Sequence, residues 1–465
     1  MFRFVAVAVL VLVAISAAQA GRLAVLDPLY SGTGRTTTAF DIASSSRRDE
    51  ARTLLTRGSG SSLRYLGVGQ IAQASGVGIG LALYKTNGQL DTSFQTSGRR
   101  LPNFSMMQVA GATIDTVDRI VVVGQGNNQR ALIARFNFDG SDDTSLGGSG
   151  HISLDFFPGK ITRLTRIVVS YGGYWVGGEV DNGTGQFDTF LAQVDYNGTN
   201  LGVVVTQDLG GIDTDNDRLI DVKATDIPET MSGREILVLS DNNSDSYAGT
   251  LSAFNASTRA LRWSTRLERS DFTGCTTTDY NLNSAQIVTN DYFARYSFVV
   301  GTLMDNDGGH TQTYLAMLDD DDGSIYDFYC EPYDASAPIH SVIGAAFYVD
   351  NLGTLGQSYL HIAQNNANRM GYARWKLNAA SGNNIYAPDG VLSGANSVSV
   401  TYSAVAGTTP FSAPKSIVLD PVTFQPVVFG LRLYEYDGMG IDDYDFTLLK
   451  LKAGDILFAD NFEND

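Results

Sequence analysis

The chain has 465 residues, of which 43% are apolar, and a formal net charge of -18 at pH 7. This apolar fraction is too high for a disordered chain, and the excess of acidic residues argues against nucleic-acid binding, which needs clustered Lys and Arg. The 49 glycines follow no three-residue period, which excludes a collagen-like fibre.

The N-terminal segment, residues 1–20, predicts export. Arg3 precedes an apolar run from Phe4 to Ile15, and small residues follow up to Ala20. This order is typical of a secretory signal peptide cleaved after Ala20. The alternative is a transmembrane anchor, but about a dozen apolar residues fall short of the roughly 20 that span a bilayer. We therefore expect a secreted, periplasmic or cell-surface protein without a transmembrane segment after cleavage.

The rest of the chain predicts short antiparallel strands. Apolar stretches rich in Val, Ile, Tyr, Phe and Thr are separated by Asn-Gly, Asp-Gly and Ser-Gly turn signals. One unit, an apolar strand that ends at a turn, occurs seven times. The copies are GLALYKTNG (80–88), LIARFNFDG (132–140), LAQVDYNG (191–198), LSAFNAST (251–258), LAMLDDDDG (315–323), YARWKLNAASG (372–382) and LLKLKAG (448–454).

The ends of the repeat array predict a closed ring. Early repeats continue after the turn into a fourth strand, as in LDTSFQTSGRRLPNF (90–104). The same kind of phrase, LDPLYSGTGRTTTAF (26–40), stands alone near the N-terminus, whereas the last repeat lacks it. A ring buries both faces of each small sheet and protects the sheet edges. We therefore predict an all-β, seven-bladed β-propeller over residues 21–454, with Gly34 to Phe40 closing the last blade and a C-terminal tail at 455–465.

These phrases resemble the delta-60 repeat, a bacterial propeller-type repeat of exported and surface proteins. The resemblance covers residues 22–41, 64–104 and 119–156, where the L-D-x-S-F phrase and the strand RIVVVG occur. It implies a propeller-type fold and export, but no agreed activity or catalytic residues. The segment ILFADNFE (456–463) is similar to the I-F-x-D-G-F-E tail of exported gammaproteobacterial proteins, with Asn461 at the usual glycine.

The loops between second and third strands, together with the crossovers between blades, carry much of the Asp and Asn. In an up-and-down blade these loops share one face, so we expect an acidic binding surface there. The leading hypothesis is a monomeric, non-enzymatic binding or scaffold module for a protein or glycan partner. The alternative is a polysaccharide hydrolase or lyase that uses carboxylates at this face or in the central channel. No G-x-S-x-G, H-E-x-x-H or Walker motif occurs, so no catalytic residue is assigned.

One loop has the spacing of a calcium site. Its four carboxylates follow a D-x-D-x-D-x-x-x-D pattern, which can wrap oxygen ligands around a hard cation. Arg218 stands where a glycine allows the sharp turn, and Ala224 stands where a glutamate completes such a site. The alternative is a solvated acidic turn. The predicted metal ligands are Asp213, Asp215, Asp217 and Asp221.

The two cysteines, Cys275 and Cys330, predict one disulfide in an exported chain. Both fall in successive crossovers, and equivalent loops of neighbouring blades lie close together. The alternative is two separate small apolar side chains.

Calcium binding predicts a change in thermal stability. If calcium is a structural ion, a chelator lowers the melting temperature of the mature protein, because the ion binds the folded state only. The measurement is a thermal melt with and without EDTA. An unchanged midpoint removes calcium as a structural ion.

Overall fold

The computed structural model describes residues 25–40, 49–73, 76–181, 183, 185–207, 217–225, 235–241, 247–268, 284–289, 296–304, 311–330, 340–349, 358–366, 370–377, 397–400, 412–436 and 442–452. Within these ranges the chain is almost entirely β, apart from a short 3-10 helix at Gly60–Ser62. No helix in this described part has the length and apolar character needed to cross a membrane. The predicted all-β class is confirmed.

Within the described sheets every strand pair is antiparallel, and most pairs join strands that follow one another along the chain. The largest sheet has two halves, which are joined through the pair Val77 and Met106. The first half contains β3 (Asp49–Arg57), β4 (Arg64–Gln73), β5 (Gly76–Lys85) and β6 (Arg99–Arg100). The second half contains β7 (Met106–Ile114), β8 (Ile120–Gly126), β9 (Ala131–Phe136) and β10 (His151–Leu154).

Four sheets of four strands come next along the chain. The first contains β11 (Thr162–Ser170), β12 (Gly173–Asp181), β13 (Phe187–Asp195) and β14 (Asn200–Gln207). The second contains β15 (Arg218–Thr225), β16 (Glu235–Asp241), β17 (Tyr247–Asn255) and β18 (Leu261–Glu268). The third contains β19 (Ser284–Thr289), β20 (Tyr296–Met304), β21 (Thr311–Asp319) and β22 (Ile325–Cys330). The fourth contains β23 (His340–Val349), β24 (Ser358–Asn366), β25 (Met370–Leu377) and β26 (Ser397–Val400).

The last sheet combines the two ends of the described chain. It contains β27 (Ser412–Leu419), β28 (Pro426–Tyr436) and β29 (Asp442–Lys452). Two N-terminal strands, β1 (Val25–Leu26) and β2 (Arg35–Thr38), both pair with β29. We call the contact of residues 25–40 with β29 the seam.

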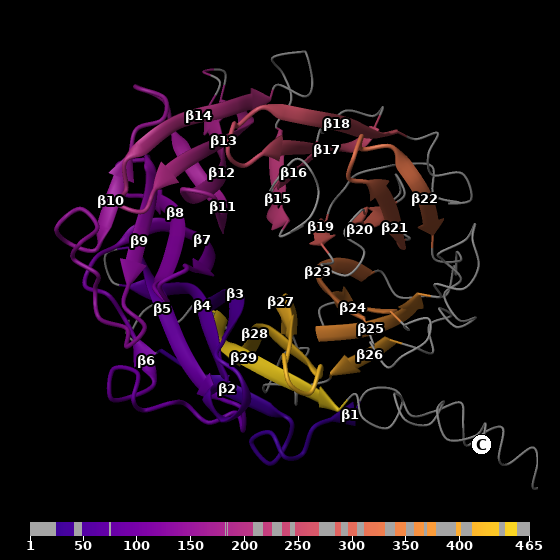
Figure 1. The fold of residues 1–465 in the computed structure, drawn as a ribbon. Coiled ribbons are helices and arrows are strands. Elements are labelled where there is room, and N and C mark those ends of the chain that lie inside the picture. Colours follow the sequence, from indigo (N-terminus) through magenta and orange to yellow (C-terminus); the bar gives the residue numbers. More distant parts are fainter. Residues whose placement is uncertain are drawn as a thin grey trace, which may run out of the picture.

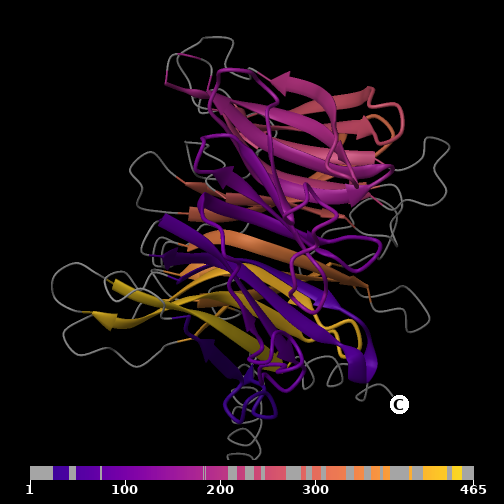
Figure 2. The same cartoon turned by 90° about the vertical axis from the view of Figure 1, so that its left-hand side faces the viewer.

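The sheets lie around a common centre (Figure 1). The strands nearest the centre are β3, β7, β11, β15, β19, β23 and β27, and each contacts the next, with β27 contacting β3. In the perpendicular view neighbouring sheets lie face to face (Figure 2). This arrangement is a propeller-like all-β fold.

The hydrophobic core lies between neighbouring sheets. Each buried cluster takes its side chains from two sheets that follow one another around the centre, or from the two halves of the largest sheet. Trp175 of β12, for example, clusters with Ile236 of β16, and Phe298 of β20 with Leu360 of β24. Both faces of each sheet are therefore covered, which removes apolar area from water on each side.

The seam has a core of the same kind. Phe446 of β29 packs edge-on against Phe40, with ring centroids 5.0 Å apart, and against Phe429 at 5.3 Å. Its ring also lies against Gly69 of β4, where an added Cβ would lie 2.7 Å from the ring atom Cε1. A side chain at that strand position would therefore separate the first and last sheets.

The N-terminal phrase at 26–40 makes the same turn as its two counterparts in the early repeats. In each phrase a glycine N–H donates to the carbonyl oxygen four residues earlier: Gly34 to Tyr30, Gly98 to Phe94 and Gly150 to Leu146. The glycine carbonyl oxygen then accepts an N–H from a third strand, donated by Lys450, Leu83 and Arg135 respectively. The phrase that stands alone in the sequence is thus structurally equivalent to the complete ones.

Two glycines test the seam. Gly32 and Gly34 both have left-handed backbones, with φ of +74° and +76°. A Cβ at Gly32 would meet nothing within 4 Å, whereas one at Gly34 would lie 2.9 Å from the backbone nitrogen of Asp27. We expect Gly32→Ala to lower the free energy of unfolding by about 1 kcal/mol and Gly34→Ala by about 3 kcal/mol. Urea denaturation measures both, and equal losses would contradict the close packing of Gly34 against the backbone of Asp27.

Candidate functional site at the seam

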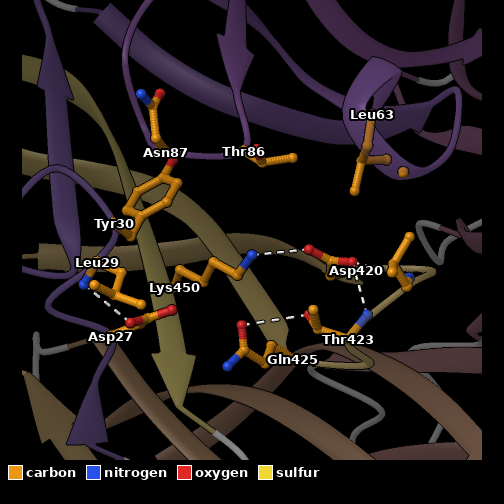
Figure 3. Close-up of a pocket in the computed structure, with 12 residues that line it drawn as sticks. Asp27, Leu29, Tyr30, Leu63, Thr86, Asn87, Asp420, Thr423, Gln425 and Lys450 are labelled. Carbon is orange, nitrogen blue, oxygen red and sulfur yellow. Dashed lines mark hydrogen bonds and ion pairs between the residues drawn. The ribbon is translucent and has the colours of Figure 1, made fainter.

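A pocket of about 460 Å³ opens at the seam (Figure 3). Its walls come from the segment before β2, the turns that follow β3, β5 and β27, and the end of β29. The lining residues are Asp27, Leu29, Tyr30, Gly60, Leu63, Thr86, Asn87, Asp420, Val422, Thr423, Gln425 and Lys450. The pocket therefore depends on both ends of the chain.

A buried ion pair forms the floor of this pocket. The Lys450 ammonium donates to Asp420 Oδ2 at 2.8 Å, and the Tyr65 hydroxyl donates to the same oxygen at 2.7 Å. The other carboxylate oxygen, Oδ1, accepts the backbone N–H groups of Val422 and Thr423 at 2.9 and 3.0 Å. Four donors thus compensate for the burial of the Asp420 carboxylate.

These contacts hold the pKa values of Asp420 and Tyr65 far from neutrality. Burial by itself raises the pKa of Asp420, but the hydrogen bonds from Lys450, Tyr65 and the backbone outweigh it and lower the pKa to about 2. Burial raises the pKa of Tyr65, and its hydrogen bond to Asp420 raises it further. Near neutral pH one group is a carboxylate and the other a phenol, so neither is suited to general acid–base catalysis.

The same kind of network occurs between two other sheets. Asp115, in the turn after β7, accepts the Tyr174 hydroxyl at 2.9 Å and Arg119 Nε at 2.7 Å. Arg135 of β9 lies 3.3 Å from the Tyr174 hydroxyl oxygen, and burial raises the pKa of Tyr174 to about 12. A tyrosine, an aspartate and a cation thus connect sheets at two places, which indicates a structural role.

The remaining polar groups of the pocket are hydroxyls, amides and one carboxylate. Asp27 Oδ1 accepts the N–H of Leu29 at 3.0 Å, and the Thr423 hydroxyl donates to Gln425 Oε1 at 3.3 Å. The apolar side chains of Leu29 and Val422 border them, and these residues are 82% and 52% exposed. The site offers donors and acceptors to a small polar ligand, with apolar surface beside them.

The predicted calcium set is only partly within the described chain. Asp213 and Asp215 lie outside the described residues, whereas Asp217 and Asp221 are buried. Asp221 lies within strand β15, and its Oδ2 accepts the N–H of Ile287 in β19 at 3.0 Å. In the described part of the chain no group of three or more His, Cys, Asp or Glu is arranged to hold a metal ion. Calcium binding therefore stays a prediction.

The disulfide also stays a prediction. Cys330 is the last residue of β22, but Cys275 lies outside the described residues.

Two of the histidines have structural contacts: His151 stacks on Phe104 at 4.3 Å, and the buried His361 hydrogen bonds the Tyr372 hydroxyl at 2.7 Å.

The pocket lies at the opposite end of the strands from the predicted acidic face. Turns that follow first and third strands share one end of an up-and-down sheet, and the pocket is lined by turns of this kind. Much of the acidic loop sequence, including 208–216, 242–246 and 305–310, lies outside the described residues.

The sequence did not predict Asp420, Lys450 and Tyr65 as residues of a site. The one signal for them was a lysine between two leucines in the last strand, LLKLK.

No protein-family model matches the chain, and no curated protein is similar to it. Drosophila Plexin A, in a complex with Semaphorin 1b, is similar to it at 6% identity and a TM-score of 0.46, over 92% of this chain and 88% of that one. A subtype N10 neuraminidase-like protein of A/little yellow-shouldered bat/Guatemala/060/2010 is similar at 13% identity and a TM-score of 0.38, over 71% of this chain and 95% of that one. Sqt1 from Chaetomium thermophilum is similar at 10% identity and a TM-score of 0.45, over 88% of this chain and 97% of that one. At these identities and TM-scores the similarities do not bear on function.

A mutant cycle tests the structural role of the ion pair. Asp420→Asn leaves the Lys450 ammonium buried without its counter-charge, so we expect a loss of about 3 kcal/mol in the free energy of unfolding. Lys450→Met leaves the carboxylate unpaired, with a similar loss. The double variant removes both charges and should recover most of the stability, as measured by urea denaturation. Additive losses in the double variant would show that the two groups do not act as a pair.

Proposed function

We propose that the chain is an exported, seven-bladed propeller that acts as a non-catalytic binding or scaffold module. Three features support seven blades. The largest sheet divides into two four-stranded halves at a single residue pair, the innermost strands contact one another in a cycle, and β2 completes the sheet of β27–β29. The segment from Gly34 to Phe40 would then close the ring.

The observation that carries the non-catalytic proposal is the use made of the buried charged groups. Asp420 and Asp115 are each held by a cation and by a tyrosine from a neighbouring sheet, and Asp221 accepts a backbone N–H from the next sheet. A hydrolase requires carboxyl groups free to exchange protons with a substrate. Groups that hold the sheets together favour a rigid platform, on which loops bind a partner.

We place the partner-binding surface on the Asp- and Asn-rich loops, and the partner is a protein or a glycan. The seam pocket at the other end would be a second, smaller site for a polar ligand. Cleavage after Ala20 would release the mature protein outside the cytoplasm.

A charge-matched comparison tests the binding surface. Mature protein is used to capture partners from envelope extracts and from purified polysaccharides. We expect Asp213→Asn with Asp215→Asn to reduce capture at least tenfold, because the acidic face loses two charges. Asp118→Asn with Asp139→Asn removes the same charge from turns at the opposite end and should leave capture unchanged. Equal capture by all three proteins would exclude the acidic face as the binding surface.

The alternative, a polysaccharide hydrolase or lyase, has one observation in its favour. Burial raises the pKa of Asp320 to about 6, which is within the range of a general acid. Asp320 is only 3% exposed, and its carbonyl oxygen accepts the indole N–H of Trp263 at 2.8 Å. Turnover of a glycan panel by the wild type, abolished by Asp320→Asn, would replace the binding proposal with the enzymatic one.

A further inference from the structure

The innermost strands have the opposite charge balance to the whole chain. Although the chain carries a net charge of -18, the seven strands nearest the centre contain more basic than acidic residues. The basic residues are Arg52, Arg57, Arg163, Arg166, Arg218, Lys223 and Lys415, and the acidic ones are Asp49, Glu50 and Asp221.

Most of these cations have a carboxylate partner. Arg57 pairs with Asp118 at 2.9 Å, Arg218 pairs with Asp241 at 2.5 Å, and Arg163 pairs with Glu179. Arg166 and Lys223 lie 3.6 and 3.9 Å from the two oxygens of Asp221. Among the described residues no carboxylate lies within ion-pair distance of Lys415.

Arg52 and Lys415 occupy corresponding positions in two neighbouring strands. Six of the innermost strands have a β-bulge near the middle, where the register against the second strand shifts by one residue. The bulged residues are Arg52, Ala110, Thr165, Ile220, Ile343 and Lys415. Two of these are charged, both are cations, and their strands, β3 and β27, are in contact.

Both cations are partly buried, and each lacks a full set of partners. Burial lowers the pKa of Lys415, and the positive charge of Arg52 lowers it further, whereas Glu50 opposes this effect. Arg52 Nη2 donates to Glu50 Oε2 at 2.6 Å, but Arg52 Nε is buried and has no hydrogen-bond partner in the described part of the chain. Glu50 therefore pairs with Arg52 and acts on Lys415 only through its charge.

We propose that a small oxyanion of the phosphate or sulfate type binds between the Arg52 guanidinium and the Lys415 ammonium, where β3 and β27 meet. Guanidinium and ammonium groups are the usual protein donors to such oxyanions. The anion supplies the missing negative charge and accepts the hydrogen bond that Arg52 Nε does not make within the described residues. The site lies in the first halves of β3 and β27, whereas the seam pocket lies beyond the ends of these strands.

Thermal melts in phosphate test this site. Without phosphate, we expect Lys415→Met to melt at the same temperature as the wild type or higher, because the change removes a partly buried cation next to Arg52. At ten times the dissociation constant, phosphate should raise the wild-type melting temperature by about 2 °C. It should leave Lys415→Met unchanged relative to sodium chloride of equal ionic strength, and calorimetry should show at least tenfold weaker binding by this variant.

Lys223→Met is the matched control, since it removes the same charge from an innermost strand on which the cation already has Asp221 nearby. It should keep the wild-type response to phosphate. A wild type that does not respond, or a Lys415→Met variant that responds as the wild type does, would overturn the proposal. So would equal loss of binding in both lysine variants, which would indicate a general charge effect.

The source of the oxyanion is distinguished by a second probe. If glucose 6-phosphate raises the melting temperature of the wild type as inorganic phosphate does, and does not raise that of Lys415→Met, the site binds a phosphate group carried by a larger molecule. Stabilisation by inorganic phosphate and sulfate alone supports binding of the free ion.

Discussion

Face-to-face packing of neighbouring sheets is the interaction on which the rest of this structure depends. A four-stranded antiparallel sheet of short strands has two apolar faces and too little area to be stable alone. Each buried cluster joins two neighbouring sheets or the two halves of the largest sheet, so every sheet depends on the sheet before it and the sheet after it. The seam completes this pattern, because Phe40, Phe429 and Phe446 pack the first sheet against the last.

The polar groups follow from this packing. Charged side chains at the ends of the strands lie between sheets, where water is excluded, so each of them needs a polar partner. Lys450, Asp420 and Tyr65 meet this requirement at the seam, and Arg119, Asp115 and Tyr174 meet it elsewhere. Arg52 and Lys415 meet it incompletely, and this distinguishes them from the other charged residues of the innermost strands.

The strand pattern was readable from the sequence for a local reason. Alternating apolar residues and Asn-Gly or Asp-Gly turns act within one repeat, so the strands of the described early repeats lie where the repeat pattern expects them. The lone phrase at 26–40 carried long-range information, because it supplies the strand that the last repeat lacks and pairs with β29 of that repeat. By contrast, Asp221 was predicted within an acidic loop but lies in strand β15, where its carboxylate bonds to β19. Spacing alone does not distinguish a loop ligand from a contact between sheets.

The amino-acid sequence by itself determined the all-β class, the repeating unit and the segment that pairs with the last strand, since these depend on residues close together in the repeat. Only the tertiary structure decided which charged side chains meet. Asp420 and Tyr65 are 355 positions apart, and Arg52 and Lys415 belong to the first and last sheets. Their proximity follows from the ring, which brings the two ends of the chain together, and no local pattern records it. The seam pocket exists for the same reason, because its walls come from both ends of the chain.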